Sequence, residues 1–268
     1  MTQDPSSNYP SPSSYPEYPA DPPPPHPPVE QRVSIQAPQK RPVVTYTLLA
    51  ITIIIFLLQE ASKYIFGYDL VAGLGMKVND LILAGQYWRL FTPMFLHGSV
   101  LHLGFNMYAL YIFGPGLERF YGHGRFIVLF ILAGFAGNVF SFMFSASPSL
   151  GSSTAIFGLL AAEGVFLYQN QKIFGRGSRK ALNNIIMIAV VNLIIGLSPG
   201  IDNWGHMGGL LGGAIFAFLG GPILEVQGLS PKLRIVDSRE SGDVIRAALV
   251  DILIFGALAV GTIYMRTV

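Results

Sequence analysis

The chain has 268 residues, of which 51% are hydrophobic and only 12% are charged, and its formal net charge is +2. Soluble domains carry about 25% charged residues, so this composition excludes an ordinary water-soluble protein and indicates a large surface facing lipid. The dispersed basic residues give no indication of a nucleic-acid partner, and the absence of cysteine excludes disulfides, thiolate metal sites and a cysteine nucleophile.

The chain begins with a proline-rich segment. Residues 1–42 hold 13 of the 19 prolines, including PPPPHPP at 22–28. Such a segment buries too little apolar surface to fold, so we expect a disordered cytoplasmic tail with polyproline II character. Its composition favours a solubilising tether and leaves open a docking site for an unknown proline-binding partner.

Seven apolar stretches follow, and each is long enough for a helix of roughly 20 residues that crosses a bilayer core of about 30 Å. They lie at about 43–62, 99–116, 125–146, 152–171, 181–198, 204–223 and 245–265. We therefore expect an all-α, polytopic membrane helix bundle. Residues 43–223 would form a core of six helices, 224–244 a cytoplasmic linker, and 245–268 an additional transmembrane helix.

The basic residues predict the orientation in the membrane. With a cytoplasmic N-terminus, 13 of the 17 lysines and arginines fall in cytoplasmic segments. Because cytoplasmic loops of membrane proteins are enriched in these residues, we expect the N-terminus inside and the C-terminus outside. The small size and the lack of targeting signals favour a multi-pass protein of a bacterial plasma membrane.

The connection at about 63–98 is predicted to lie in the outer membrane interface. Its second half, LILAGQYWRLFTPMFLHGS at 81–99, is rich in aromatic and aliphatic residues, and Gly85 and Pro93 interrupt it. Tyr87 and Trp88 suit the level of the lipid headgroups. The segment is too broken to span and too apolar to extend into water, so we expect it to contact membrane lipid.

Hydroxyl side chains begin the fourth apolar stretch, where GSSTAIFG places Ser152, Ser153 and Thr154. One explanation is a simple helix N-cap. However, Gly151 permits a tight turn, and Gly158 leaves room for a neighbouring helix. A hydroxyl held beside another helix is a candidate functional group, because polar side chains within a span are costly.

A histidine begins the sixth stretch on the same side of the predicted membrane. His206 is followed by Gly209 and Gly213, so the backbone below the imidazole can approach another helix. Alone, His206 could be a structural hydrogen-bonding group, a proton relay or a ligand. Together with a serine in a water-poor pocket, it would form a nucleophile with its general base.

His102 and Asn106 lie four residues apart on one face of the second stretch. The amide of Asn106 could donate to an oxyanion, or both side chains could simply join helices. A metal site would need three or four ligands, and His97, His102 and His206 have no carboxylate nearby in sequence except Asp202 at the water interface. We therefore expect neither a metal nor a cofactor.

These motifs together resemble the rhomboid family of intramembrane serine proteases, from about Trp88 to Gly213. In chain order they are a W-R pair, an H-x-x-x-N pattern, an acid after the second span, a G-x-S pattern and an H-x-x-G-x-x-x-G pattern. The matching residues are Trp88, Arg89, His102, Asn106, Glu118, Gly151, Ser153, His206, Gly209 and Gly213. The chain departs from the family pattern at Thr154 and Gly205, where the family usually has glycine and alanine.

The resemblance implies that Ser153 is the nucleophile and His206 the general base. It implies an oxyanion hole from His102, Asn106 and the backbone N–H of Ser153, with supporting roles for Trp88, Arg89, Glu118, Gly151, Gly209 and Gly213. Phe157 would pack on the imidazole and orient it without a third carboxylate. The implied substrates are transmembrane proteins, cleaved near the extracytoplasmic side.

Two other classes of function remain open from the residues. A catalytically silent rhomboid-like protein would bind membrane proteins for trafficking or quality control, but such relatives typically lack the serine or the histidine. A small transporter or channel would be favoured by internal repeats or by several acids at mid-membrane. We find no convincing repeat, and Glu163 is the one candidate acid.

Overall fold

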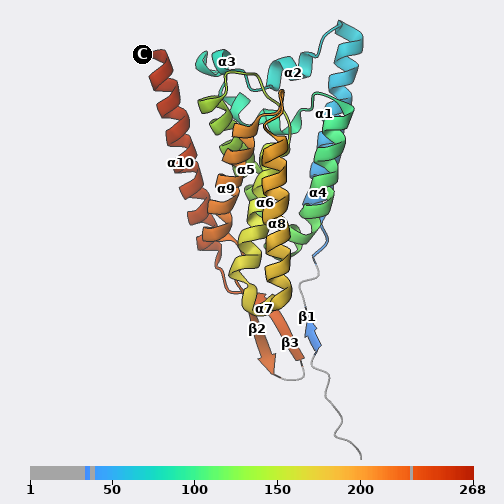
Figure 1. Cartoon of the computed structure of the whole chain (residues 1–268), viewed down its shortest axis with the longest axis vertical. Helices are drawn as coiled ribbons and strands as arrows, with labels where there is room; N and C mark the ends of the chain where they lie inside the picture. The colour runs from blue at the N-terminus through green and yellow to red at the C-terminus, as the bar shows by residue number, and fades with distance from the viewer. Residues whose placement is uncertain (1–33, 37–39, 230–231) are drawn as a thin grey trace, which may run out of the picture.

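The computed structural model describes residues 34–36, 40–229 and 232–268 and shows long helices running roughly side by side (Figure 1). In this part of the chain, seven helices of at least 17 residues lie where spans were predicted: α1 (Val43–Phe66), α4 (Val100–Tyr121), α5 (His123–Phe144), α6 (Ser153–Gln169), α8 (Arg176–Ile195), α9 (Asn203–Gly220) and α10 (Ser241–Thr267). The predicted disordered tail, 1–42, lies outside the described residues except for 34–36 and 40–42.

Four of these helices, α1, α5, α8 and α10, are long and apolar enough to cross a membrane. The chain is therefore an integral, multi-pass membrane protein with a mostly helical fold. The other three are less apolar or shorter: α6 has 17 residues, α9 contains six glycines, and α4 contains Glu118 and Arg119. The count of seven membrane-crossing helices stays a prediction.

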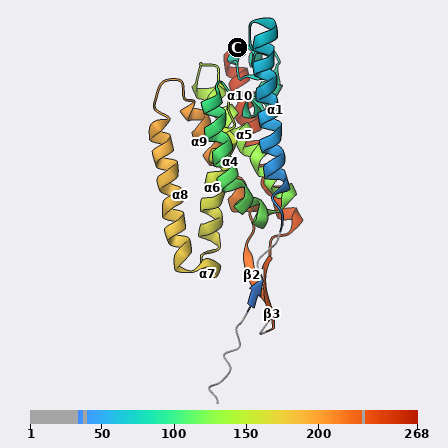
Figure 2. The same cartoon turned by 90° about the vertical axis from the view of Figure 1, so that its right-hand side faces the viewer.

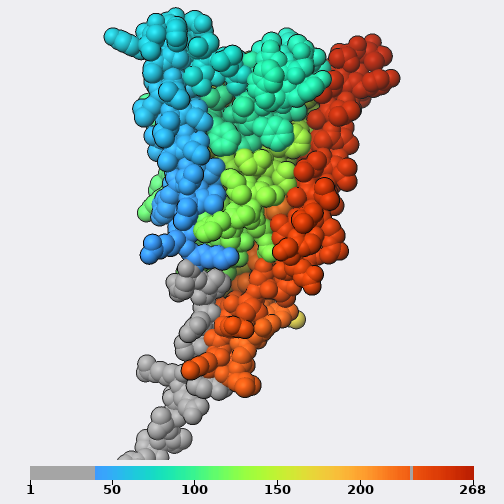
Figure 3. Space-filling view, turned by 180° about the vertical axis from the view of Figure 1, so that it is seen from behind, coloured from blue at the N-terminus to red at the C-terminus, as the bar shows by residue number. Residues whose placement is uncertain are grey.

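The centre of the bundle consists of α5, α6 and α9, which pack most extensively on one another. Fully buried Phe130 of α5, Leu159 of α6 and Phe216 of α9 belong to the same hydrophobic core. The pair α1 and α4 lies on one side of this centre and α10 on the other, as Figures 1 and 3 show. Helix α8 packs on the outside of α6 (Figure 2) and is otherwise largely exposed.

The two ends of the bundle are built differently, and we call them upper and lower as in Figure 1. The upper end holds the connection between α1 and α4, which folds into α2 (Leu70–Gly75), α3 (Asn79–Leu83) and two 3-10 turns, η2 (Tyr87–Leu90) and η3 (Thr92–Phe95). The predicted interfacial connection is thus a folded cap of short helices. The lower end holds the short helix α7 (Gln171–Phe174).

A small sheet at the lower end departs from the all-α expectation. Strands β2 (Leu224–Leu229) and β3 (Lys232–Asp237) pair antiparallel within the predicted linker, and β1 (Ser34–Gln36) pairs parallel to β3, giving the order β1-β3-β2. The Arg125 guanidinium contacts the Asp237 carboxylate at 2.7 Å and joins the hairpin to α5. Hydropathy of long apolar stretches cannot reveal such a sheet, because its strands are short and lie outside the bundle.

Glycines set the distance between α6 and α9. A Cβ at Gly209 would lie 2.0 Å from the Thr154 carbonyl oxygen, and one at Gly213 would lie 2.3 Å from the Gly158 carbonyl oxygen. The two backbones are in direct contact, which only residues without a side chain permit. The first turn of α6 and the first turn of α9 are therefore held beside each other at the upper end.

We predict that Gly209→Ala separates these helices and lowers the free energy of unfolding in detergent by about 1–3 kcal/mol or more, the usual cost of overpacking. The matched control is Gly256→Ala in α10, where an added Cβ meets no atom within 4 Å. There alanine should be neutral or stabilising by up to about 1 kcal/mol. Equal thermal unfolding temperatures for the two variants would contradict the close-contact argument.

Candidate active site

A tight turn precedes the candidate nucleophile. Gly151 has φ +139°, a conformation that favours glycine, and its N–H donates to the Pro93 carbonyl at 2.9 Å. A Cβ at this position would lie 2.8 Å from the His102 ring. After the turn, Ser152 occupies the N-cap position of α6 and Ser153 is the first helical residue. The turn therefore directs Ser153 toward the space beside His102.

The structure brings Ser153 and His206 together. The Ser153 hydroxyl lies 3.0 Å from Nε2 of His206, within hydrogen-bonding distance. Phe157 stacks on the imidazole with a centroid distance of 4.1 Å and an interplanar angle of 10°. The stacking fixes the plane of the ring so that Nε2 faces the hydroxyl. The arrangement can transfer a proton from serine to histidine.

Both groups open into a cavity of about 590 Å³ at the upper end. The segment between α5 and α6 contributes the polar wall, since Ser145, Ser147 and Ser149 line the cavity. The cavity is also lined by Leu101, His102 and Phe105 of α4 and by the residues before α9, Gly200, Ile201 and Asp202. The cavity has room for an extended peptide segment beside the serine hydroxyl.

The two predicted oxyanion residues are placed differently. His102 lines the cavity, and its ring meets that of His97 edge-on with centroids 5.1 Å apart. The buried Asn106 amide instead donates to the His102 carbonyl of its own helix at 3.1 Å, and Asn106 is not among the cavity-lining residues. The geometry therefore places His102 at the reaction space, whereas the Asn106 amide points to its own helix.

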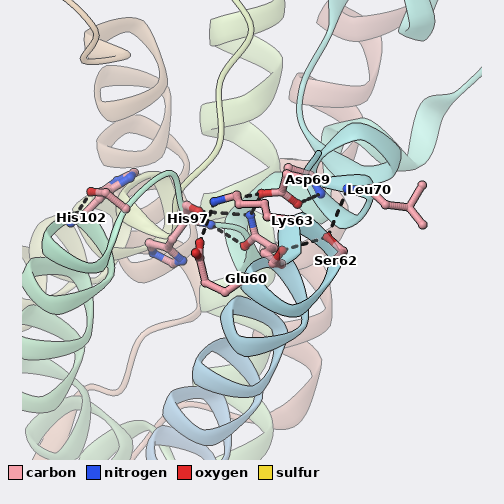
Figure 4. Close-up of polar contacts among 10 residues, drawn as sticks. Glu60, Ser62, Lys63, Asp69, Leu70, His97 and His102 are labelled. Carbon is pink, nitrogen blue, oxygen red and sulfur yellow. Dashed lines mark hydrogen bonds and ion pairs between the residues drawn. The ribbon is translucent and has the colours of Figure 1, made fainter. Parts of the chain in front are cut away.

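A buried group of hydrogen bonds that the sequence analysis missed connects Gln59, Asp69 and His97 to Ser152, the residue before Ser153; we call it the Gln59 clamp. The amide of Gln59 in α1 accepts from the His97 N–H at 3.0 Å and donates to the His97 carbonyl at 3.1 Å. It also donates to Asp69 at 2.9 Å, and Nε2 of His97 lies 3.2 Å from the Ser152 hydroxyl. Figure 4 shows this region around His97 and Asp69. The signal in the sequence was an amide near the end of a mostly apolar span.

Lys77 is a second connection to the loop before Ser153. The residue is fully buried between α2 and α3, and its ammonium group donates to the carbonyls of Ser145 and Ser147 at 2.9 and 2.7 Å. The backbones of Lys77 and Ser149 also form an isolated antiparallel bridge. Burial lowers the pKa of Lys77 to about 8. The upper cap thus fixes the serine-rich wall of the cavity.

The remaining predicted supporting residues lie away from the Ser153 hydroxyl. Arg89 is buried and donates to the carbonyls of Met76 and Gly73 at 2.7 Å each, and Trp88 donates to the Leu74 carbonyl at 3.0 Å, so both stabilise the upper cap. Glu118 lies at the lower end and accepts from the backbone N–H groups of Val44 and Thr45 at the start of α1. A carboxylate there satisfies unpaired donors of the helix N-terminus.

The fold and the site define the class of protein. It is a multi-pass helical membrane protein in which a serine and a histidine are in contact within a cavity at one end of the bundle. A family model of the Rhomboid domain matches residues 84–223. The chain therefore belongs to the rhomboid family, and the resemblance seen in the sequence is confirmed.

Three relatives show the extent of the similarity. Rhomboid protease GluP of Bacillus subtilis (strain 168) is 42% identical over 174 residues, which are 65% of this chain and 34% of that protein. RHOMBOID-like protein 9, chloroplastic, of Arabidopsis thaliana is 37% identical over 153 residues, 57% of this chain and 35% of that protein. Putative rhomboid protease YdcA of Bacillus subtilis (strain 168) is 32% identical over 184 residues, which are 66% of this chain and 88% of that protein. The matches to the first two span about a third of those proteins' length.

We predict that Gln59→Leu lowers the free energy of unfolding by about 2–4 kcal/mol, because it leaves the buried N–H and carbonyl of His97 without partners. Thr52→Val, in the same helix, is the matched control, since the buried Thr52 hydroxyl has no hydrogen-bond partner in the described residues. Thermal unfolding in detergent measures both. A Gln59→Leu variant as stable as Thr52→Val would show that the clamp contributes nothing.

The lowered pKa of Lys77 predicts a pH dependence of stability. Below about pH 8 the amine is protonated in both folded and unfolded protein. Between pH 8 and the ordinary lysine pKa of 10.5, the folded state loses the proton and the unfolded state keeps it, so the free energy of unfolding rises with pH. The full gain is about 3 kcal/mol.

The measurement compares wild type with Lys77→Met in detergent at pH 7.5 and pH 10. The stability of the wild type relative to this variant should increase between the two values. A difference that stays constant with pH would contradict the burial of a titrating amine at this position.

Proposed function

We propose that the chain is a serine-type intramembrane endopeptidase with Ser153 as nucleophile and His206 as general base. The observation that carries the proposal is the 3.0 Å contact between the Ser153 hydroxyl and Nε2 of His206, made in a cavity and not on the surface. Membership of the rhomboid family and the similarity to proteins named rhomboid proteases support it.

In the proposed reaction the Ser153 oxygen attacks the carbonyl carbon of the scissile peptide while His206 takes the hydroxyl proton. The tetrahedral intermediate collapses when His206 gives this proton to the leaving nitrogen, which breaks the C–N bond and leaves an acyl group on Ser153. Water, deprotonated by the same imidazole, then attacks the ester carbon. Serine recovers its proton from His206, and the second product leaves as a carboxylic acid.

The developing oxyanion needs hydrogen-bond donors near Ser153. We assign the backbone N–H of Ser153, at the N-terminus of α6, and the His102 side chain, whose ring lies against Gly151. Asn106 would join them only if its amide left the His102 carbonyl, to which it donates at 3.1 Å. Phe157 keeps the imidazole in the plane that faces the hydroxyl.

We further propose the substrate and the orientation. The substrate is a transmembrane protein whose helix unwinds beside the cavity, since an intact helix hides its carbonyl groups, and the cavity at the upper end admits an extended strand. All seven long helices cross the membrane, with the upper end extracytoplasmic and the N-terminus cytoplasmic. The basic residues of the lower connections, among them Lys172, Arg176 and Arg234, support this placement. The relatives include proteins of Bacillus subtilis and of Arabidopsis thaliana, so the placement in a bacterial plasma membrane rests on the sequence prediction.

Covalent labelling by a fluorophosphonate probe in detergent tests the proposal. We expect labelling of the wild type and its loss in Ser153→Ala, which removes the attacking oxygen. His206→Asn should label at least about 1,000-fold more slowly, because the serine loses its base. Ser152→Ala is the matched control: its hydroxyl contacts His97, does not line the cavity, and should be dispensable for labelling.

Two outcomes would contradict the assignment. Loss of labelling in Ser152→Ala with labelling kept in Ser153→Ala would make Ser152 the nucleophile. A wild type that folds but labels no faster than Ser153→Ala would favour a catalytically silent rhomboid-like protein that binds membrane-protein helices.

A further inference from the structure

Asp202 lies at the entrance to α9 with one carboxylate oxygen unused. It is the N-cap of this helix, and its Oδ1 accepts from the Gly205 N–H at 3.0 Å. Its second oxygen, Oδ2, is buried and makes no hydrogen bond within the described part of the chain. A capping role requires only one oxygen, so Oδ2 is left over.

The position of Asp202 relative to His206 is fixed by the helix. The Asp202 carbonyl accepts from the His206 N–H at 3.2 Å, so the two residues lie one turn apart, where side chains are neighbours. His206 uses Nε2 for the Ser153 hydroxyl, and its buried Nδ1 has no partner among the described residues. An unpaired carboxylate oxygen and an unpaired ring nitrogen therefore occur on the same turn.

Asp202 is also part of the reaction space. It lines the cavity together with Ser153 and His206, and it is the only carboxylate among the described residues that do so. The other titratable groups that interact with Asp202 or with His206 are Lys77 of the upper cap, which interacts with Asp202, and His102 of α4, which interacts with His206. Neither group is an anion, so Asp202 is the source of negative charge among the described residues that line the cavity.

Gly205, one of the two departures from the family pattern, borders this carboxylate, and Thr154, the other, borders Gly205. A Cβ at Gly205 would lie 3.0 Å from Oδ2 of Asp202 and 3.1 Å from the Thr154 methyl group. Glycine in place of the usual alanine thus gives the carboxylate space against the backbone. The Thr154 hydroxyl is itself buried without a partner in the described residues, so no donor from Thr154 neutralises Oδ2.

We propose that Asp202 is a positioning residue of the hydrolytic site, whose charge stabilises the imidazolium form of His206 through space. The inference rests on the proposed function. During serine attack His206 becomes positively charged, and a carboxylate one turn away in a water-poor cavity favours that form. The site is then a serine–histidine pair supported by an acid that makes no direct hydrogen bond to the imidazole. The sequence analysis placed Asp202 at the water interface and gave it no role.

The rate of fluorophosphonate labelling, measured in detergent from pH 5 to 9, tests this role. Asp202→Asn retains a side-chain oxygen for the helix cap and removes the charge. We expect its labelling at pH 7.5 to fall about tenfold, and the acid limb of its pH profile to move about one unit lower, because an imidazole without the nearby anion binds its proton less tightly.

Two further variants separate charge from structure. Asp202→Ala should show the same displacement of the acid limb together with a lower unfolding temperature, since it also loses the cap. Asp251→Asn is the matched control, because Asp251 is a buried acid of α10 that does not line the cavity. Its profile should overlie that of the wild type.

The outcomes distinguish this inference from the proposed function. Labelling of Asp202→Asn at the wild-type rate with an unchanged acid limb overturns the role of Asp202 alone. A slower rate with an unchanged limb and a lowered unfolding temperature also overturns it, because the residue is then only a cap. If the wild type is not labelled at all, the proposed function fails and this inference fails with it.

Discussion

The backbone contact between α6 and α9 is the constraint on which the site depends. Gly209 faces the Thr154 carbonyl and Gly213 faces Gly158, at distances that no side chain could occupy. This contact places the first turns of two helices, which are 50 residues apart in the chain, at one depth. The Ser153 hydroxyl and the His206 imidazole then meet without any flexible segment between them. The phenyl ring of Phe157, one turn further along α6, completes the arrangement by stacking on the imidazole.

The contact between α6 and α9 does not fix the loop that precedes α6, and hydrogen bonds from α1 and the upper cap hold this loop in place. The Gln59 amide forms hydrogen bonds with the backbone N–H and carbonyl of His97, and the His97 ring contacts the Ser152 hydroxyl. Helix α1 is therefore connected to the residue before Ser153 by two successive hydrogen-bonded contacts. Lys77 does the same for the serine-rich wall of the cavity. A buried amide or ammonium is tolerable in an apolar setting because carbonyl or carboxylate oxygens accept hydrogen bonds from it. These contacts join both the wall and the turn to α1 and the upper cap.

Electrostatics distinguish the two ends of the bundle. At the lower end the Glu118 carboxylate is fully satisfied by the first turn of α1 and by His123, which suits a purely structural anion. At the upper end Asp202 caps α9 with one oxygen and leaves the other unpaired beside the cavity. The Glu118 carboxylate is fully paired and the Asp202 carboxylate only half-paired, and the proposed role of Asp202 rests on this difference.

The sequence by itself was sufficient to predict the long helices, the family and the residues that match the motifs of that family. Apolar length predicts a helix wherever lipid is the solvent, and the glycine, serine and histidine spacings are local patterns. Only the tertiary structure decided which polar groups meet: that Asn106 bonds to its own helix, that Gln59 holds His97, that Asp202 shares a cavity with His206, and that residues 224–237 pair as strands. The reason is physical. The Gln59–His97 contact and the cavity shared by Ser153, Asp202 and His206 depend on how distant segments pack. The Asn106–His102 bond and the 224–237 hairpin depend on a side-chain rotamer and on local strand pairing, and hydropathy and short motifs carry no information about either.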